Sequence, residues 1–366
     1  MGELYIGIMS GTSLDGVDIA LTELTPATQS ANLLGALCLP FPPDLRDDLL
    51  ALCQSGTDEI RRAGRAGQQW ARLAAQGVHQ LLSQLDLTAS QIAAIGSHGQ
   101  TIRHHPESGF SVQIGAPALL AELCGIDVIT DFRNRDLAAG GEGAPLVPAF
   151  HAWLLHDPQQ ARLLINVGGF ANLTLLAPDQ QVTGFDSGPG NVLLDYWVEQ
   201  HTGKAFDANG AWARSGQIIP DLLDGMLADN YFSRPAPKST GREYFNPEWL
   251  QQQLAGIQHP PADVQATLLE LTARSIAAAA GTCKPSPAAI YVCGGGAHNG
   301  LLMERLQQLL KGCSVSTTAA LGVDPDWMEA MAFAWLALRC QQRLSGNLPA
   351  VTGAQAERVL GAIYPA

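Results

Sequence analysis

Apolar residues along the chain form two successive series of short runs, separated by turns rich in Gly, Ser, Asn and Asp. In the first series, runs at 4–9 and 17–24 flank the turn SGTSLDG, and a third run follows at 33–41. Such spacing predicts a meander of three strands. Further along, the pattern predicts a helix over 58–85, a buried strand at 92–99, a helix over 116–124 and a strand at 126–132.

The pattern restarts at residue 161 with ARLLINVGGFANLTLLAP, which again places two apolar runs around a Gly/Asn turn. Helices over 190–201, 263–283 and 324–344 and a strand in AIYVCGGG are expected to complete this half. We therefore predict an α/β protein of two domains, since 366 residues exceed the usual size of one domain. The first would span 1–158, joined by the C-terminal tail 341–366, and the second would span 159–340.

Composition and charge restrict the class of partner. The chain has 21 basic and 34 acidic side chains, a net charge of −13, which disfavours binding to nucleic acid. The N-terminal MGELYIGIMSGTS lacks the basic region of a signal peptide, and the apolar stretch at Ser275 is too short to span a membrane. We expect a soluble, cytoplasmic protein without a membrane partner. The seven cysteines form no CxxC pair, which favours reduced thiols over zinc ligands.

Three turns of Gly and small polar residues follow strand-like runs: MSGTSLDGVD, NVGGFAN and VCGGGAHN. Residues without bulky side chains let backbone N–H groups approach phosphate oxygens closely. Each turn alone is typical of an ordinary loop. Three of them in two similarly ordered halves favour a nucleotide held in a cleft between the halves. None matches the P-loop or dinucleotide-binding pattern.

The blocks IGIMSGTSLDGVDIAL, GSHGQTIRHHP, TDFRNRDLAAGGEGAPLVP, INVGGFANLT, FDSGPGN, VCGGGAHN and WMEAMAFAWLA occur in this order between residues 6 and 337. Together they resemble the anhydro-N-acetylmuramic acid kinase family. The resemblance implies two α/β domains of the actin/Hsp70/hexokinase type, which are ribonuclease H-like, with an active-site cleft between the domains. It also implies a homodimer.

The family resemblance implies an ATP- and Mg²⁺-dependent reaction. Water would add at C1 of the 1,6-anhydro sugar while the γ-phosphoryl group passes to O6, giving N-acetylmuramic acid 6-phosphate and ADP. The catalytic base implied for this chain is Asp186 of FDSGPGN. From the sequence alone, a turn residue or the N-cap of the following helix is the commoner role for such an aspartate.

The resemblance also implies two sets of nucleotide-binding residues. A first phosphate loop would consist of Gly11, Thr12, Ser13, Leu14, Asp15, Gly16, Val17 and Asp18. A second loop and the adenosine side would consist of Gly168, Gly169, Asn172, Gly294, Gly295 and Gly296. At least one of Asp15 and Asp18 should meet the metal through water, because Mg²⁺ usually keeps several waters. An Asx turn is the structural alternative for either residue.

The expected sugar-binding residues are His98, Arg133 and Glu329. Glu329 either bonds the sugar or only stabilises its helix through the dipole. Arg133 or Arg135 would bind the carboxylate of the lactyl group, and pairing with Asp131 or Asp136 is the alternative.

A metal site at His98, His104 and His105 is disfavoured, since no carboxylate or thiolate stands at ligand spacing. No residue is assigned as a direct metal ligand.

Two other functions remain open at this stage. An ordinary sugar or carboxylate kinase of the same fold would use Asp186 to deprotonate a substrate hydroxyl group. An actin-like nucleotide switch would close on ATP to control a partner.

Overall fold

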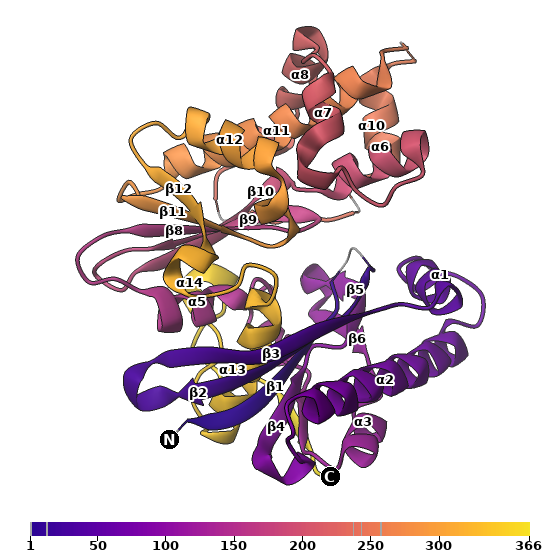
Figure 1. Cartoon of the computed structure of the whole chain (residues 1–366), viewed down its shortest axis with the longest axis vertical. Coiled ribbons are helices and arrows are strands. Elements are labelled where there is room, and N and C mark those ends of the chain that lie inside the picture. Colours follow the sequence, from indigo (N-terminus) through magenta and orange to yellow (C-terminus); the bar gives the residue numbers. More distant parts are fainter. Residues whose placement is uncertain (1, 12–13, 237, 243, 257) are drawn as a thin grey trace. The chain divides into compact units, whose positions relative to one another are not determined.

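The computed structural model describes residues 2–11, 14–236, 238–242, 244–256 and 258–366 (Figure 1). The chain divides into two compact units. Unit 1 comprises Met1–Leu154 together with Trp327–Ala366, and unit 2 comprises Leu155–Asp326. In the described part of the chain, no helix has the length and apolar character needed to cross a membrane.

Unit 1 is built on a six-stranded sheet with the order β13-β7-β4-β1-β2-β3. Its strands are β1 (Glu3–Met9), β2 (Gly16–Thr25), β3 (Ser30–Pro40), β4 (Ile92–Ser97), β7 (Val128–Thr130) and β13 (Ala362–Tyr364). Strands β1, β2 and β3 form the antiparallel meander that the sequence predicts. Strand β4 lies parallel to β1, and β7 lies parallel to β4.

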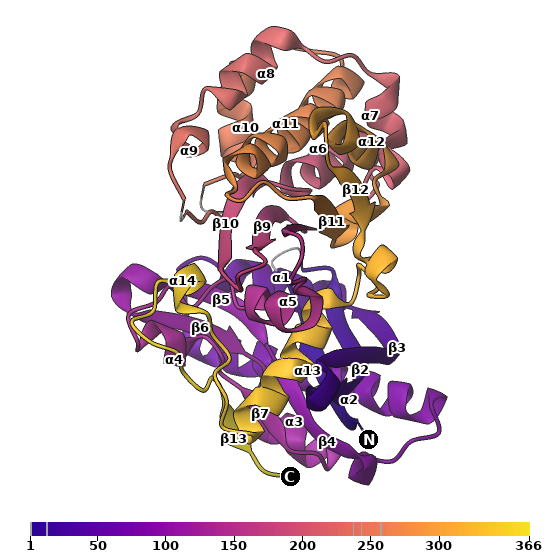
Figure 2. The ribbon, with the colours of Figure 1, turned by 90° about the vertical axis from the view of Figure 1, so that its left-hand side faces the viewer.

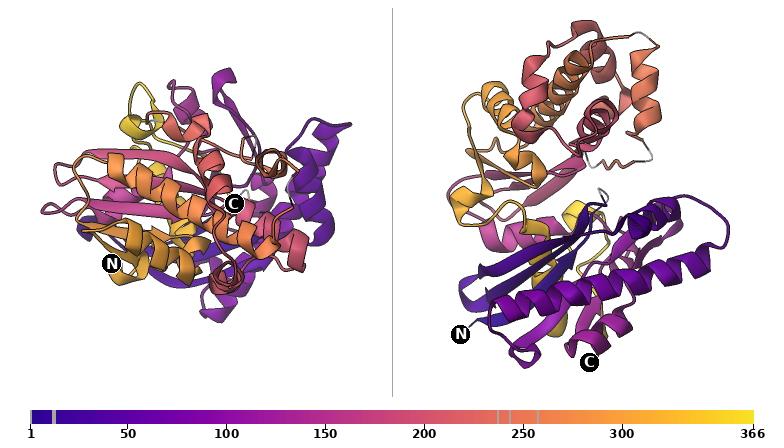
Figure 3. Two further views of the ribbon diagram at one scale, coloured as in Figure 1. Left: turned by 90° about the horizontal axis from the view of Figure 1, so that it is seen from above. Right: turned by 45° about the vertical axis from the view of Figure 1, so that its right-hand side comes forward.

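The meander is covered on both faces. Helix α2 (Glu59–Gln84) lies along β2 and β3, as the right-hand view of Figure 3 shows, and its Gly77 faces Ile19. Helix α13 (Met328–Gln341) packs against β1 and β4. Gly7 faces α13 and pairs with Ala20 on β2, so Ala20 points to the same face of the sheet. Ile19 is next to Ala20 on β2, and neighbouring residues of a strand point to opposite faces. The two helices therefore cover opposite faces, which explains why β1 is buried from Tyr5 to Met9.

Helix α13 belongs to unit 1, which differs from the sequence-based division that placed residues up to 340 in the second domain. Gly7 and Gly96 are register partners on β1 and β4. A Cβ atom on either glycine would overlap a backbone carbonyl of α13, that of Ala330 or Phe333. Two adjacent glycines thus let the helix backbone lie directly on the sheet. The first boundary falls after Leu154, four residues before the expected position, and unit 1 includes the tail 341–366.

The remaining elements of unit 1 surround this sheet. The β5–β6 hairpin forms a small sheet of its own. Its strands and the other helices are β5 (Gln100–His105), β6 (Phe110–Ile114), α1 (Pro43–Leu52), α3 (Pro117–Cys124), α4 (Asn134–Leu137), α5 (Val147–Leu155), α14 (Pro349–Thr352), η1 (Pro26–Thr28), η2 (Ala89–Gln91) and η3 (Pro106–Ser108).

Unit 2 repeats the arrangement with a five-stranded sheet in the order β10-β9-β8-β11-β12. Its strands are β8 (Arg162–Val167), β9 (Phe170–Leu176), β10 (Val182–Pro189), β11 (Ala289–Cys293) and β12 (Ser314–Thr317). Again the first three strands form an antiparallel meander, and the next two continue in parallel from the first strand. The common order in the two units is the ribonuclease H-like topology, so the predicted two-domain fold class is confirmed.

The helices of unit 2 gather beside its sheet, with α11 against β9 and β10 (Figure 2). They are α6 (Val192–Thr202), α7 (Ala211–Ser215), α8 (Pro220–Leu227), α9 (Asn230–Ser233), α10 (Pro247–Leu254), α11 (Pro261–Thr282), α12 (Gly300–Leu309), η4 (Ala208–Gly210), η5 (Gly295–His298) and η6 (Thr318–Leu321). Helix α11 is buried along most of its length, as expected for a helix in the centre of a packed layer.

Candidate active site

A row of polar residues crosses the sheet of unit 2 near the end of three strands. Asp186 on β10 pairs with Asn172 on β9, and Asn172 pairs with Asn166 on β8. Directly opposed residues point to the same face of a sheet. The two predicted residues Asp186 and Asn172 are thereby brought together. Asn166 was missed by the sequence analysis, although it ends the same apolar run that leads into the Gly168 turn.

The backbone and carboxyl group of Asp186 are held by α9 and the segment that follows it. The Asp186 amide donates to the Lys238 carbonyl at 2.9 Å, and its own carbonyl accepts the Tyr231 hydroxyl at 2.8 Å. Carboxyl oxygen Oδ2 accepts the Thr240 amide at 3.0 Å. The side chain is half-buried. Asp186 is not the N-cap of α6, a position that Asn191 occupies.

Three glycine-containing turns of unit 2 contact one another at the strand ends. The Gly168 carbonyl accepts the Asn191 amide, and the Gly169 carbonyl accepts the Gly190 amide, both at 2.9 Å. Gly294 lies in the left-handed region with φ of 77°, where a Cβ atom would meet the Asn166 side chain. The second phosphate loop and the adenosine-side turn of the sequence analysis are therefore adjacent.

Close packing leaves no room for a side chain at some of these glycines, whereas at others it does not. A Cβ atom on Gly296 would overlap the Val167 side chain, so close packing alone requires glycine there. At Gly168 and Gly295, a Cβ atom would have no neighbour closer than 3.8 and 3.7 Å. Close packing therefore does not by itself require glycine at these two positions.

The expected first phosphate loop connects β1 to β2. Thr12 and Ser13 lie outside the described residues. The Gly11 carbonyl accepts the Leu14 amide at 3.4 Å and the Gln100 side chain at 3.2 Å. Leu14 and Val17 are buried in the core of unit 1. Their side chains therefore anchor the loop and do not face a ligand.

Two carboxylates flank the end of this loop. Asp15 is exposed and Asp18 is half-buried. Burial together with the charges of Asp18 and Asp15 raises the pKa of the neighbouring Cys38 thiol to about 12. Gly16 begins β2 where a Cβ atom would overlap the Leu39 carbonyl. Carboxylate oxygens suit Mg²⁺, but among the described residues no group of three or more His, Cys, Asp or Glu side chains is placed to hold a metal.

The three predicted sugar-binding residues are brought together in unit 1. Arg133 donates from Nε and Nη2 to Nε2 of His98 at 3.0 and 2.9 Å, and from Nη1 to the Gly143 carbonyl at 2.8 Å. His98 stacks on Phe333 of α13 with ring centroids 4.8 Å apart. Glu329 lies one helical turn before Phe333, and its charge acts on Arg133.

The protonation states in this cluster follow from burial and charge. Burial and the Arg133 charge lower the pKa of His98 well below its usual value, so the ring is neutral and accepts both arginine bonds. Burial lowers the pKa of Arg133 to about 10, against the opposing effect of Glu329 and Asp136. Arg133 therefore remains charged at neutral pH.

The alternative partners of Arg133 are engaged elsewhere. Asp131 accepts the Asn134 side chain at 2.7 Å. The Asp136 carboxylate accepts bonds from Gly143, Asn347 and Thr352. Arg135 is exposed.

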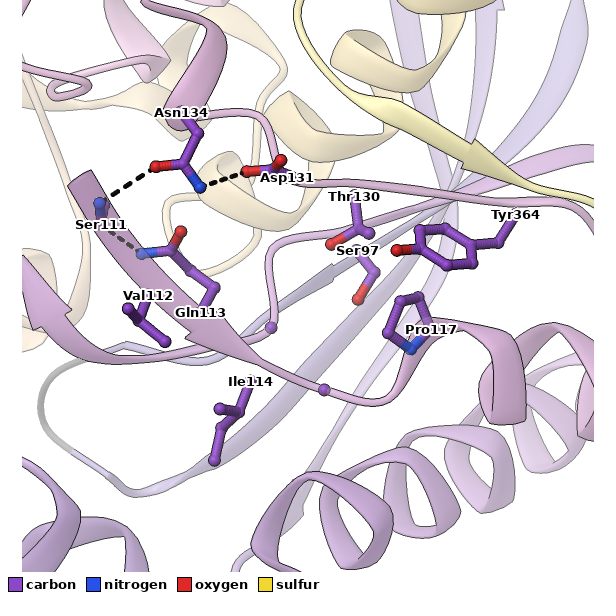
Figure 4. A pocket seen from close by; sticks show the side chains of 12 residues that line it. Ser97, Ser111, Val112, Gln113, Ile114, Pro117, Thr130, Asp131, Asn134 and Tyr364 are labelled. Carbon is purple, nitrogen blue, oxygen red and sulfur yellow. Dashed lines mark hydrogen bonds between the residues drawn. The ribbon is translucent and has the colours of Figure 1, made fainter. Parts of the chain in front are cut away.

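A cavity of about 350 Å³ lies in unit 1 (Figure 4). Its lining includes Ser97 and Asn134, which are next to His98 and Arg133 in the sequence. Its walls include the hydroxyl groups of Ser97, Thr130 and Tyr364 and the carboxyl group of Asp131. None of its lining residues is basic. This cavity suits neutral polar groups and disfavours anions.

The repeated ribonuclease H-like units, the clustered glycine turns and the strand-end carboxylate define a protein of the actin/Hsp70/hexokinase class. Within that class, the sequence matches the family described as anhydro-N-acetylmuramic acid kinase over residues 3–366, and the chain belongs to this family. It is 58% identical over 364 residues to the anhydro-N-acetylmuramic acid kinase of Pseudomonas putida, and this match covers 99% of each chain.

Further relatives carry the same name. The chain is 57% identical over 363 residues to the protein of Pseudomonas paraeruginosa and 51% identical over 364 residues to that of Nitrosomonas europaea. Both matches cover 99% of each chain. These relatives are named as kinases, enzymes that transfer a phosphoryl group to an alcohol.

Proposed function

We propose that the protein is an ATP-dependent kinase that opens 1,6-anhydro-N-acetylmuramic acid by hydrolysis and phosphorylates O6, in the recycling of cell-wall sugars. The products are N-acetylmuramic acid 6-phosphate and ADP. The observation that carries this proposal is the half-buried carboxylate of Asp186, held at a strand end beside the glycine turns of unit 2.

Asp186 is the general base of this reaction. Its carboxylate takes a proton from the water whose oxygen bonds to C1. The C1–O6 bond breaks, and O6 bonds to the γ-phosphorus of ATP while ADP leaves. The backbone bonds to Lys238 and Tyr231 fix the strand, and the Thr240 amide orients one carboxyl oxygen.

The nucleotide phosphates bind along the open backbone at Gly168 and Gly295 and at the Gly11 loop. Asp15 and Asp18, which lie beside that loop, would hold Mg²⁺, at least one of them through water. When bound, Mg²⁺ would neutralise charge on the phosphates. His98, Arg133 and Glu329 bind the sugar. A homodimer stays a prediction from the family resemblance, and a cytoplasmic location stays a prediction from the sequence.

The reaction is tested with purified protein, Mg²⁺ATP and the anhydro sugar in ¹⁸O-labelled water. We expect sugar-dependent ADP formation and a phosphorylated product whose mass shows one label at C1. Label in free phosphate would instead indicate plain ATP hydrolysis. Phosphorylation of ordinary sugars in preference to the anhydro sugar would support the general sugar kinase, and ADP release without sugar dependence would support the nucleotide switch.

The base is tested by Asp186→Asn, which keeps the shape of the side chain and removes its basicity. We expect turnover to fall by roughly 10²–10⁴-fold, with nucleotide affinity by calorimetry unchanged. The matched control is Asp224→Asn, because Asp224 is an exposed carboxylate on α8 of the same unit. Normal turnover of the Asp186 variant would remove Asp186 from the base role.

A further inference from the structure

A second cavity, of about 310 Å³, lies in unit 2. It is lined by Arg234, Pro235, Lys238 and Ser239, in the segment that follows α9 in the sequence. The two cations are close enough to interact, because burial and the Arg234 charge lower the pKa of Lys238. In the described part of the chain, no ion pair includes either cation. Among the residues that the structure describes, these two neighbouring positive charges form no ion pair, in a molecule of net charge −13.

The Lys238 ammonium group is fixed in position. Nζ donates to the carbonyl oxygens of Tyr231 at 3.1 Å and Phe232 at 3.4 Å, and it lies 4.6 Å from the centre of the Tyr231 ring. An ammonium group has three donors, and these two carbonyl groups take two of them. Arg234 is exposed. The cavity thus combines one oriented ammonium group with one accessible guanidinium group, and the two together suit an oxyanion.

The same segment holds the proposed base. The carbonyl of Lys238 accepts the Asp186 amide at 2.9 Å, and the amide of Thr240, two residues later, donates to the Asp186 carboxylate at 3.0 Å. The cationic cavity is therefore built onto the residues that orient Asp186. A ligand that bears an anionic group would be drawn toward the base by these charges.

The other groups available for an anion are less suitable. Arg133 directs three of its N–H groups to His98 and Gly143, and its charge is opposed by Glu329. The 350 Å³ cavity of unit 1 carries the Asp131 carboxylate and no basic residue. The structure thus offers a better site for an anion at Arg234 and Lys238 than at Arg133.

We propose that Arg234 and Lys238 form an oxyanion-binding site that recognises the carboxylate of the sugar acid on which the enzyme acts. The inference rests on the proposed function, whose substrate carries one carboxylate on its lactyl ether. A phosphate group of the nucleotide has the same oxyanion chemistry, and the experiment separates the two sources.

The test uses Arg234→Gln in the full-length protein, because this exposed side chain can be replaced without disturbing the core. Calorimetry compares anhydro-N-acetylmuramic acid with anhydro-N-acetylglucosamine, which lacks the lactyl group. We expect the variant to bind the acidic sugar about 10-fold more weakly, the lower end for hydrogen bonds to charged groups, and the neutral sugar and ATP as before. Arg234→Lys should restore much of the affinity.

The matched control is Lys204→Gln, which removes one exposed charge elsewhere in unit 2. It should leave the preference for the acidic sugar intact, which excludes an effect of net charge. Weaker binding of ATP alone in Arg234→Gln would overturn the carboxylate assignment in favour of phosphate. Unchanged affinities for all three ligands would overturn the site. Both results are read only once wild-type protein is shown to turn over the anhydro sugar. If wild-type protein does not turn it over, the proposed function is wrong, and the two failures are thus distinguished.

Discussion

Asp136 is the most extensively bonded carboxylate near the proposed sugar-binding residues. It is fully buried, and its Oδ1 accepts the side chains of Asn347 at 2.6 Å and Thr352 at 2.8 Å. Its Oδ2 accepts the Gly143 amide at 2.9 Å. The carbonyl of Gly143 in turn accepts Arg133. Asp136 is therefore a positioning residue that acts on Arg133 through the Gly143 loop.

Replacing Asp136 by Asn turns one acceptor oxygen into a donor that faces existing donors. We expect the free energy of unfolding to fall by about 3 kcal/mol, the upper range for bonds to a charged group, as measured by urea denaturation. The KM for the sugar should rise more than the KM for ATP, since Arg133 would lose its fixed position. The exposed Asp86 provides a control, and Asp86→Asn should change neither quantity. An Asp136 variant with normal stability and normal KM values would refute the positioning role.

Sequence patterns locate single residues of this cluster but not their partners. The family resemblance points to Arg133, yet residue types alone left a pairing with Asp131 or Asp136 open. The pairing is decided by contacts across long sequence separations, since Asp136 bonds Asn347 from 211 positions away. The same holds for Asn166, whose place in the row with Asn172 and Asp186 depends on strand register.

At the scale of elements, α13 depends on two glycines of the strands beneath it. Gly7 and Gly96 face the carbonyl groups of Ala330 and Phe333. The helix carries Glu329 in its first turn, and its Phe333 supports the His98 ring. Close packing of helix on sheet therefore also sets the position of proposed sugar-binding groups.

Gly96→Ala should force α13 away from β4, because the added Cβ atom would overlap helix backbone, which cannot rotate aside. We expect a loss of roughly 1–3 kcal/mol in the free energy of unfolding and weaker sugar binding by calorimetry. Gly64→Ala serves as the comparison, since Gly64 lies on α2 with no atom near its Cβ position. That change should stabilise the protein by up to about 1 kcal/mol. Equal effects of the two substitutions would contradict this account.

Element types were predictable from the sequence where elements depend on local pattern. The meander of unit 1 and the long helix α2 follow from apolar spacing and turn residues, and both are observed. The unit to which α13 belongs was not predictable. A helix that is apolar on most sides shows no preferred face, so the pattern gave no reason to place it on β1 and β4.

At the scale of the whole molecule, the two units contain buried titratable groups of different kinds. In unit 1, burial lowers the pKa of His151 to about 3, and burial with Arg133 lowers that of His98 well below normal. In unit 2, burial alone would raise the pKa of Glu270, but bonds from Arg305 and Arg274 bring it below its usual value. The units should therefore lose stability in different ranges of pH.

We expect unit 1 to be destabilised first on acidification. As the pH falls below 6.5, His98 and His151 take up protons in the unfolded chain before they do so in the folded protein, so stability falls as pH falls. At pH 5.5 the loss is at most about 1.4 kcal/mol for each histidine. Glu270 stabilises unit 2 above its unfolded pKa, and this contribution is lost only below about pH 4.5.

Hydrogen exchange at pH 7.5 and 5.5, corrected for intrinsic rates, measures this difference between the units. The slowest amides of β1 and β4 should lose protection relative to those of β8 and β11. His151→Gln removes one titrating group and should reduce the pH dependence of unit 1 while that of unit 2 stays unchanged. An equal loss of protection in both units, or full pH dependence in the variant, would show that the buried histidines do not control acid stability.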